Sequence, residues 1–207
     1  MNTERILDAA SGIEPGRLTM LRLAESLGVD RKAVNHHVRD RETLMALLAW
    51  RTFEQHFVDP PKTGEWQSAC EHFAIAFADA AHSVGPLVEH LRPHGRPLTG
   101  FAQRTDDLVG ALLTAGFDDE QALRTVTMLV NICLTSVRDA EVARGLAEVP
   151  RRQQLRAALD ENDDSGRTAH LARILTEDID TYGAEQFRHA IRVFLLGTAA
   201  MLHEPHP

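Results

Sequence analysis

The 207-residue sequence lacks several features that mark whole classes of protein. It contains no uninterrupted apolar run approaching the roughly 20 residues that a membrane-spanning helix needs. Its start, MNTERILDAA, has no apolar core of the signal-peptide kind, so we expect a cytoplasmic protein without a membrane partner. Its two cysteines, Cys70 and Cys133, are isolated and have no zinc-type spacing. We expect both to be buried apolar residues rather than a disulfide.

Motifs of the common enzyme classes are also missing. There is no Gly-rich phosphate loop, GxSxG or HExxH, and the neighbouring carboxylates at 106–107, 118–120 and 160–164 lie where helix capping and solvation account for them. Among eleven histidines, His90 and His94 are four apart, but Pro93 disfavours the helix that would place both on one face. We therefore predict a protein that is not an enzyme and has no metal or other cofactor.

Acidic residues dominate the chain, but not its N-terminal part. The formal net charge is -8, yet residues 1–50 carry seven basic and seven acidic residues, against fifteen and twenty-three in residues 51–207. Within 31–41 there are four Lys or Arg and two His for one Asp. Binding to nucleic acid depends on the charges that reach phosphates, so a locally basic segment suffices for a DNA partner.

Helical periodicity runs through the whole sequence, and no alternating run is long enough to predict a strand, so the expected fold is all-α. Short helices are expected at 5–11, from 20 to Gly28, over 31–39 and from 41 to about 57, with Thr19, Asp30 and Asp40 as N-caps. Longer helices follow at 65–83, 101–115, 119–143 and 184–202, and Asp118 with Gln121 resembles a capping box. We divide the chain into a three-helix domain at 1–48 and a larger helical domain at 49–207, with a mobile connection carrying one short helix at about 145–168.

The helices at 119–143 and 184–202 are apolar on more than one side. A chain of this size needs a second copy of itself to cover the outer stripes, which predicts a homodimer built on these two helices. A fully buried central helix in a monomer is the alternative.

Residues 18–44, LTMLRLAESLGVDRKAVNHHVRDRETL, are typical of two short helices joined by a Gly-centred turn. A helical wheel places Lys32, Asn35 and His36 with Arg39 on one side, and the two valines at 34 and 38 on the other. Such a helix fits the major groove of DNA, where Arg and Lys bind guanine and Asn binds adenine. A surface helix with an ordinary charged face is the alternative.

The segments RILDAA, LTMLRLAESLGV and HHVRDRETLMALLAW resemble the N-terminal domain of TetR-family transcriptional repressors. GEWQ at 64–67, GFDDEQAL at 116–123 and YGAEQFRHAIRVFLLG at 182–197 are similar, more weakly, to the ligand-binding domain of the tetracycline repressors. The resemblance implies a homodimeric repressor that a small molecule releases from its double-stranded DNA operator. A metal-responsive regulator and an all-helical small-molecule-binding protein without DNA contact are the alternatives.

The same resemblance implies roles for individual residues. Arg31 and Lys32 match positions that contact base edges, and Thr19, His37 and Arg41 match positions that hold phosphates. Asn35 replaces a common Tyr, and His36 and Val38 replace more frequent aromatics, so the operator sequence does not follow from the family. The DNA-binding candidates are thus Thr19, Arg31, Lys32, Asn35, His36, His37 and Arg41.

For the effector, the resemblance places three phenylalanines, Phe57, Phe73 and Phe77, where polar and aromatic pocket groups stand. His90 falls near a metal-binding His, but Arg138 replaces the acidic residue that supports that metal, and an Arg there repels a cation. We therefore expect an apolar or aromatic, metal-free effector, with His90, His94 or Arg96 available for a hydrogen bond. The alternative is that the three phenylalanines are ordinary core residues.

Overall fold

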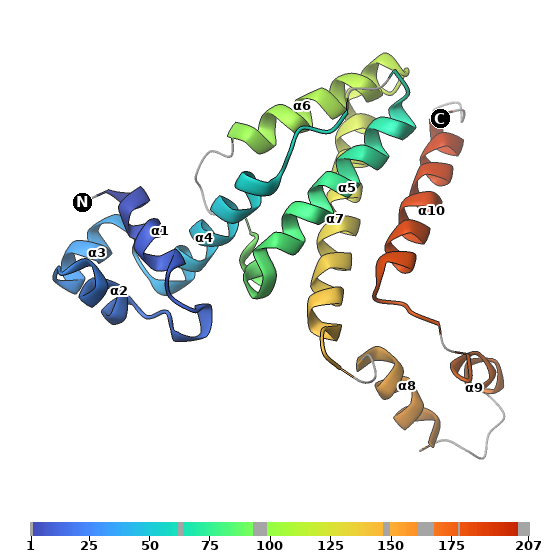
Figure 1. The fold of residues 1–207 in the computed structure, drawn as a ribbon. Helices are drawn as coiled ribbons and strands as arrows, with labels where there is room; N and C mark the ends of the chain where they lie inside the picture. The colour runs from blue at the N-terminus through green and yellow to red at the C-terminus, as the bar shows by residue number, and fades with distance from the viewer. Residues whose placement is uncertain are drawn as a thin grey trace.

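The computed structural model describes residues 2–61, 64–92, 99–146, 150–160, 168–177 and 179–202, and every regular element in these ranges is helical (Figure 1). The N-terminal elements are α1 (Thr3–Ser11), η1 (Pro15–Arg17), α2 (Met20–Leu27), α3 (Arg31–His37) and α4 (Arg41–His56). They are followed by α5 (Trp66–Val84), η2 (Gly85–His90), α6 (Thr99–Thr114), α7 (Asp119–Ala143), α8 (Pro150–Asp160), α9 (Ala169–Leu175) and α10 (Ala184–Leu202). The predicted all-α fold is confirmed. Within the described ranges, no helix is long and apolar enough to cross a membrane.

Polar side chains cap four helices at the positions that the sequence predicts. Thr19, Asp30 and Asp118 accept hydrogen bonds from backbone N–H groups in the first turns of α2, α3 and α7. Asp40 accepts two hydrogen bonds from Thr43, one from the hydroxyl at 2.7 Å and one from the backbone N–H at 2.8 Å. These bonds, with the neighbouring Arg39, lower the pKa of the Asp40 carboxyl to about 2. The cap therefore stays ionised at neutral pH.

Buried apolar residues form two clusters that meet along α4. The first, which we call the aliphatic core, contains no aromatic ring and joins α1 to α3 with the first half of α4; its buried members are Ile6, Leu7, Ala10, Leu18, Met20, Leu23, Ala24, Val34, Val38, Leu44, Met45, Leu47 and Leu48. The second, the aromatic core, begins at Ala49 and Trp50 and extends through α5, α6, α7 and α10. Leu87 of η2 packs against both cores.

The segment at about 145–168, predicted as a mobile connection with one short helix, contains one short helix, α8. A second short helix, α9, comes after this segment and was not predicted; it packs against α8, and neither helix buries a residue fully (Figure 1). The helix α8 is rich in Arg and Gln, and α9 has only seven residues, too few to establish a helical period in the sequence. Residues 161–167 lie outside the described part of the chain.

Candidate nucleic-acid interface and ligand cavities

The turn between α2 and α3 fixes the direction of α3. Gly28 has a φ of 65°, in the left-handed region that favours glycine, and the N–H of the next residue, Val29, bonds to the carbonyl of Ala24 at 3.0 Å. Beyond the turn, Val34 and Val38 are almost completely buried in the aliphatic core. Because these two side chains hold one side of α3 against the core, the opposite side faces solvent.

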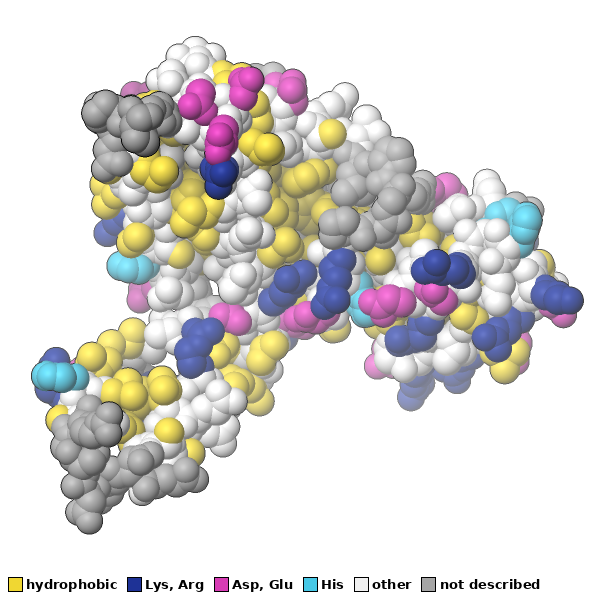
Figure 2. Space-filling view, turned by 180° about the vertical axis from the view of Figure 1, so that it is seen from behind, with side chains coloured by type: hydrophobic (Ala, Val, Ile, Leu, Met, Phe, Trp, Pro, Cys, Tyr) yellow, Lys and Arg dark blue, Asp and Glu magenta, His cyan; other side chains and the backbone are white. Residues whose placement is uncertain are grey.

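That solvent-facing side carries basic and amide groups. The exposed residues along it are Arg31, Lys32, Asn35, His36 and His37. Figure 2 shows Lys and Arg side chains gathered over the N-terminal helices, whereas the surface of the helical body is mostly hydrophobic or uncharged. The structure thus brings five of the predicted DNA-binding residues onto one short helix.

The other two predicted DNA-binding residues lie beside the start of α2. The exposed Thr19 accepts a hydrogen bond from the backbone N–H of Arg22 at 3.1 Å, which leaves its own hydroxyl hydrogen available to a further acceptor. Arg41, at the start of α4, donates to the carbonyls of Leu18 at 2.7 Å and Pro15 at 3.0 Å. Arg41 therefore holds the turn that presents Thr19.

Hydrogen bonds tie η2 and the residues after it to α4. The indole Nε1 of Trp50 donates to the carbonyl of Arg92 at 2.8 Å. Near the start of α4, the carboxylate of Glu42 lies 3.1 Å from Nδ1 of His90. From α7, the guanidinium of Arg138 donates to the carbonyl that follows η2, at 3.3 Å. Two predicted effector residues, His90 and Arg138, thus contact the junction between the N-terminal helices and the body.

The three predicted pocket phenylalanines are packed into the aromatic core. Phe57, Phe73 and Phe77 are each about 1% exposed, and their ring centroids lie 5.5 to 6.1 Å apart. Phe53 and Phe101 add further ring contacts to the same group. The structure brings the three rings together, and one of them, Phe73, borders a cavity. The other two predicted contacts, His94 and Arg96, lie outside the described residues.

The cavity beside Phe73, which we call the α5–α6 cavity, has a volume of about 280 Å³. It lies between the chain that follows α4 and the helices α5 and α6, and its lining residues are Pro60, Pro61, Gly64, Ala69, Phe73, Arg104, Asp107, Leu108, Gly110, Ala111 and Thr114. Arg104 was not predicted from the sequence. Its ion-pair partner, Asp59, is 45 positions away, so no local pattern marks the pair.

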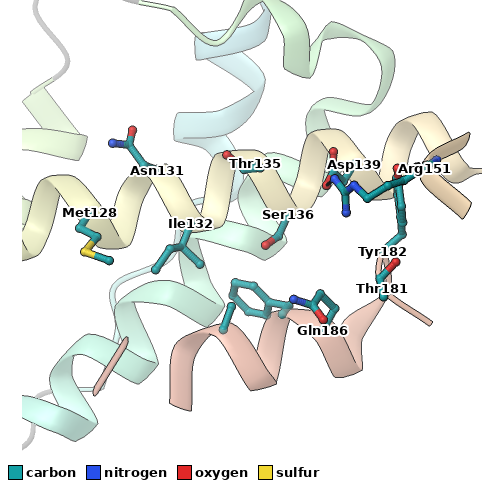
Figure 3. A pocket seen from close by; sticks show the side chains of 13 residues that line it. Met128, Asn131, Ile132, Thr135, Ser136, Asp139, Arg151, Thr181, Tyr182 and Gln186 are labelled. Atoms are coloured by element: carbon teal, nitrogen blue, oxygen red, sulfur yellow. Dashed lines mark hydrogen bonds and ion pairs between the residues drawn. The ribbon is translucent and has the colours of Figure 1, made fainter. Parts of the chain in front are cut away.

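A second cavity of about 410 Å³ separates the C-terminal half of α7 from the start of α10. Figure 3 shows Ile132 and Ser136 of α7 pointing toward α10 across this space. At its end, Arg151 lies 3.0 Å from the Asp139 carboxylate and over the ring of Tyr182 at 4.8 Å. We call this space the α7–α10 groove.

The outer sides of α7 and α10 carry exposed apolar residues. They are Leu123 and Met128 on α7, and Val193, Leu196 and Met201 on α10. A further groove of about 350 Å³ runs along the other side of α10, where it faces Ile75 of α5. The helix α10 is therefore bordered by unfilled space on both sides.

Across the described residues, no three His, Cys, Asp or Glu side chains are placed to hold a metal ion. The two cysteines, as predicted, are buried and unpaired, and burial raises the pKa of both thiols to about 12.

An exposed basic helix after a glycine turn, mounted on an all-helical body, has the geometry of a helix-turn-helix. No family model matches the chain. The class E tetracycline repressor protein of Escherichia coli is 27% identical to it over 128 residues, which are 60% of this chain and 59% of that protein. The chain thus matches less than two thirds of the length of this curated relative. Over these 128 residues the chain is thus similar to a tetracycline repressor.

Two solved structures from Streptomyces coelicolor share the fold along nearly the whole chain. A possible TetR-family transcriptional regulator has a TM-score of 0.75 and 22% identity, covering 96% of this chain and 98% of its own. The TetR-family protein ActR, in complex with actinorhodin, has a TM-score of 0.74 and 20% identity, covering 99% of this chain and 98% of its own. At these identities the structural likeness concerns the fold.

Proposed function

We propose that the protein is a ligand-responsive DNA-binding transcriptional regulator of the cytoplasm, a repressor that a small apolar or aromatic effector releases from its operator. The observation that carries the proposal is the side of α3 opposite Val34 and Val38, where basic and amide side chains are exposed together. The DNA-binding domain comprises residues 1–48, and the ligand-binding and dimerisation domain residues 49–207. The change from aliphatic to aromatic core between Leu48 and Ala49 supports this boundary.

Each exposed group on α3 has a suitable partner in the major groove. Arg31 and Lys32, in the first turn, are long enough to reach O6 and N7 of guanine, and Asn35 one turn later has the two-point pattern that adenine requires. His36 lies beside Asn35 and extends the same surface. These residues would read sequence, because they address base edges.

Phosphate contacts would position the helix in the groove. Thr19 has a free hydroxyl hydrogen for a phosphate oxygen, and His37 lies at the end of α3. Arg41 contributes by holding the carbonyls of Pro15 and Leu18 and so the position of Thr19, in addition to its own positive charge.

A homodimer through α7 and α10 would complete the body. The exposed apolar side chains of Met128 on α7 and of Leu196 and Met201 on α10 would be covered by a second copy. A two-fold dimer also presents two copies of α3, as half-sites about one helical turn of DNA apart require. Sedimentation of the protein as a monomer at micromolar concentration would contradict this arrangement.

The effector would act through the junction at η2. The candidate contacts are the aromatic group of Phe57, Phe73 and Phe77, with His90 and Arg138 beside η2; His94 and Arg96 remain predictions. Because Leu87 packs against both cores and Trp50 bonds to the carbonyl of Arg92, a rearrangement of the body would be transmitted to α4.

The test is retardation of DNA from the protein's own upstream region by the purified protein. We expect Arg31→Ala and Lys32→Ala each to cost about 1–3 kcal/mol of binding, concentrated at particular base positions. Arg41→Ala should weaken binding on all sequences and flatten the salt dependence. The matched control is Arg173→Ala, an exposed arginine on α9, which should change nothing. If all three N-terminal variants bind like the control, this face does not contact DNA.

A further inference from the structure

We propose that the α5–α6 cavity binds a planar aromatic molecule with an anionic group, and that Arg104 holds that anion. The proposal rests on the proposed function in one respect, since the bound molecule would be the effector. It goes further in naming the cavity, the charge of the molecule and the residue that selects it. The pocket predicted from the sequence shares only Phe73 with this cavity, and it did not include Arg104.

The lining of the α5–α6 cavity favours a flat molecule. Small residues, Gly64, Ala69 and Ala111, widen the space between the two helices, and the ring of Phe73 closes its inner end. A volume of about 280 Å³ is at the lower end of the range for ligand pockets, roughly 300–1,000 Å³. One or two fused rings therefore fit this space better than a larger ligand.

Arg104 is a positive charge held at low exposure beside this cavity. Its side chain is 18% exposed, and its guanidinium carbon lies 5.0 Å from the centroid of the Phe57 ring. One terminal nitrogen donates to the carbonyl of Gly100 at 2.9 Å. The buried Nε makes no hydrogen bond within the described part of the chain, although it lies 3.0 Å from the carboxylate of Asp59. A guanidinium has five N–H donors, more than the Gly100 carbonyl and the Asp59 carboxylate occupy, so its terminal nitrogens retain donors for an incoming acceptor.

The present counter-ion of Arg104 is easily replaced. The carboxylate side chain of Asp59 is 86% exposed, so water screens its attraction to Arg104 and the pair contributes little. A carboxylate carried into the cavity by an aromatic ring would be screened less and could accept two parallel hydrogen bonds from the guanidinium. The internal ion pair therefore leaves Arg104 available to a ligand.

Acidic residues also border the cavity, and they define the competing possibility. Asp107 lines it and is exposed, as is Asp59 next to it, so a cationic aromatic amine would find two carboxylates there. The anion is favoured because Arg104 is the least exposed of these three charges, and solvent screens the two exposed carboxylates more strongly. The sign of the bound charge is therefore open to direct measurement.

The experiment is titration calorimetry of the full-length protein, without DNA, using 2-naphthoate, its neutral isostere 2-naphthamide and the cationic 2-naphthylmethylamine as probes. We expect the naphthoate to bind about 10- to 100-fold more tightly than the amide, the range for a hydrogen bond to a charged group. Arg104→Gln should remove this preference and leave amide binding unchanged. Asp59→Asn should tighten naphthoate binding, because it removes the competing carboxylate. Arg173→Gln, at an exposed position on α9, is the matched control and should behave as the wild type.

Equal affinities for the naphthoate and the amide would overturn the proposal, as would tighter binding of the amine or the absence of heat from any probe at millimolar concentration. Asp59→Asn keeps the test informative if Arg104→Gln does not fold, since Asp59 is exposed. DNA retardation is measured separately. Naphthoate binding through Arg104 without DNA retardation would refute the proposed regulator and support the anion site. DNA retardation without naphthoate binding would support the regulator and refute the anion site.

Discussion

The two halves of α4 belong to cores of different composition. The first half contributes Leu44, Leu47 and Leu48 to the aliphatic core, in which every buried side chain is an aliphatic, alanine or methionine residue. The second half contributes Trp50 and Phe53 to the aromatic core, where neighbouring rings meet mainly edge to face. All eleven aromatic residues of the chain lie at or beyond Trp50, so the change is abrupt along a single helix.

The difference suits the separate tasks proposed for the two regions. A small aliphatic core has to present α3 in one orientation, and branched side chains with few rotamers are adequate for that purpose. Aromatic rings pack with specific relative orientations, and a site walled by them accepts another ring with similar contacts. The aliphatic core of residues 1–48 is therefore suited to holding α3 in a fixed orientation, and the aromatic core of the body is suited to ligand recognition.

The largest effect is expected from truncation in the aromatic core. Phe53 is fully buried and its ring contacts those of Trp50, Phe57 and Phe77, so Phe53→Ala should lower the free energy of unfolding by about 3–5 kcal/mol. Urea denaturation followed by circular dichroism measures the change. Phe53→Leu, which keeps most of the volume, should lose much less, and an equal loss in both variants would show that the edge-to-face contacts rather than the buried volume stabilise this core.

A smaller effect is expected at the turn of the N-terminal region. A Cβ on Gly28 would meet no atom within 4 Å, so Gly28→Ala introduces no steric clash with neighbouring residues. The variant therefore measures only the cost of the left-handed backbone conformation, which lowers the free energy of unfolding by roughly 1–2 kcal/mol when alanine adopts it. We expect this loss in urea denaturation, together with weaker DNA binding because α3 is reoriented. Gly12→Ala is the control, since Gly12 has a φ of -79° at the end of α1. Unchanged stability of Gly28→Ala would show that the turn tolerates another conformation.

The smallest effect concerns pH and the cap of α4. The pKa of Asp40 is about 2 in the folded protein and near 3.9 in an unfolded chain, so the cap stabilises the fold fully above the unfolded value and loses this contribution as pH falls from about 4 to 2. The carboxyl carbon of Asp40 should titrate near pH 2 by NMR. Asp40→Asn keeps a neutral cap, and its stability should depend less on pH in this window. A titration near pH 4 would contradict the cap geometry.

Elements with strong terminal signals were predictable from the sequence. The bounds of α7 and α10 agree with the prediction because the capping box at Asp118 and long apolar stripes mark them. Only one of the two helices α8 and α9 was predicted. A helix is recognised in a sequence by the apolar stripe that it buries, and neither of these two helices buries a residue fully. Helix existence could therefore be predicted best where tertiary packing is densest.

The site was predictable only in part, for a related reason. Val34 and Val38 are only four positions apart and lie among polar residues. This short pattern was enough to predict which side of α3 is exposed. An inward ring such as Phe77 gives the same spacing whether it lines a pocket or fills a core, and the structure places it in the core. Arg104 was missed because two residues that contact it, Phe57 and Asp59, are more than 40 positions away in the sequence.

The continuity of α4 between the two cores has a geometric consequence. Its 16 residues form one unbroken rod of roughly 24 Å. A rotation of about 5° at the end near Phe53 would displace the opposite end by about 2 Å over that length. Hydrogen bonds to base edges tolerate only a few tenths of an ångström around about 2.9 Å, so such a rotation is enough to break them. The length of α4 would thus turn a side-chain-sized adjustment among aromatic rings into a displacement that the proposed DNA contacts could not accommodate.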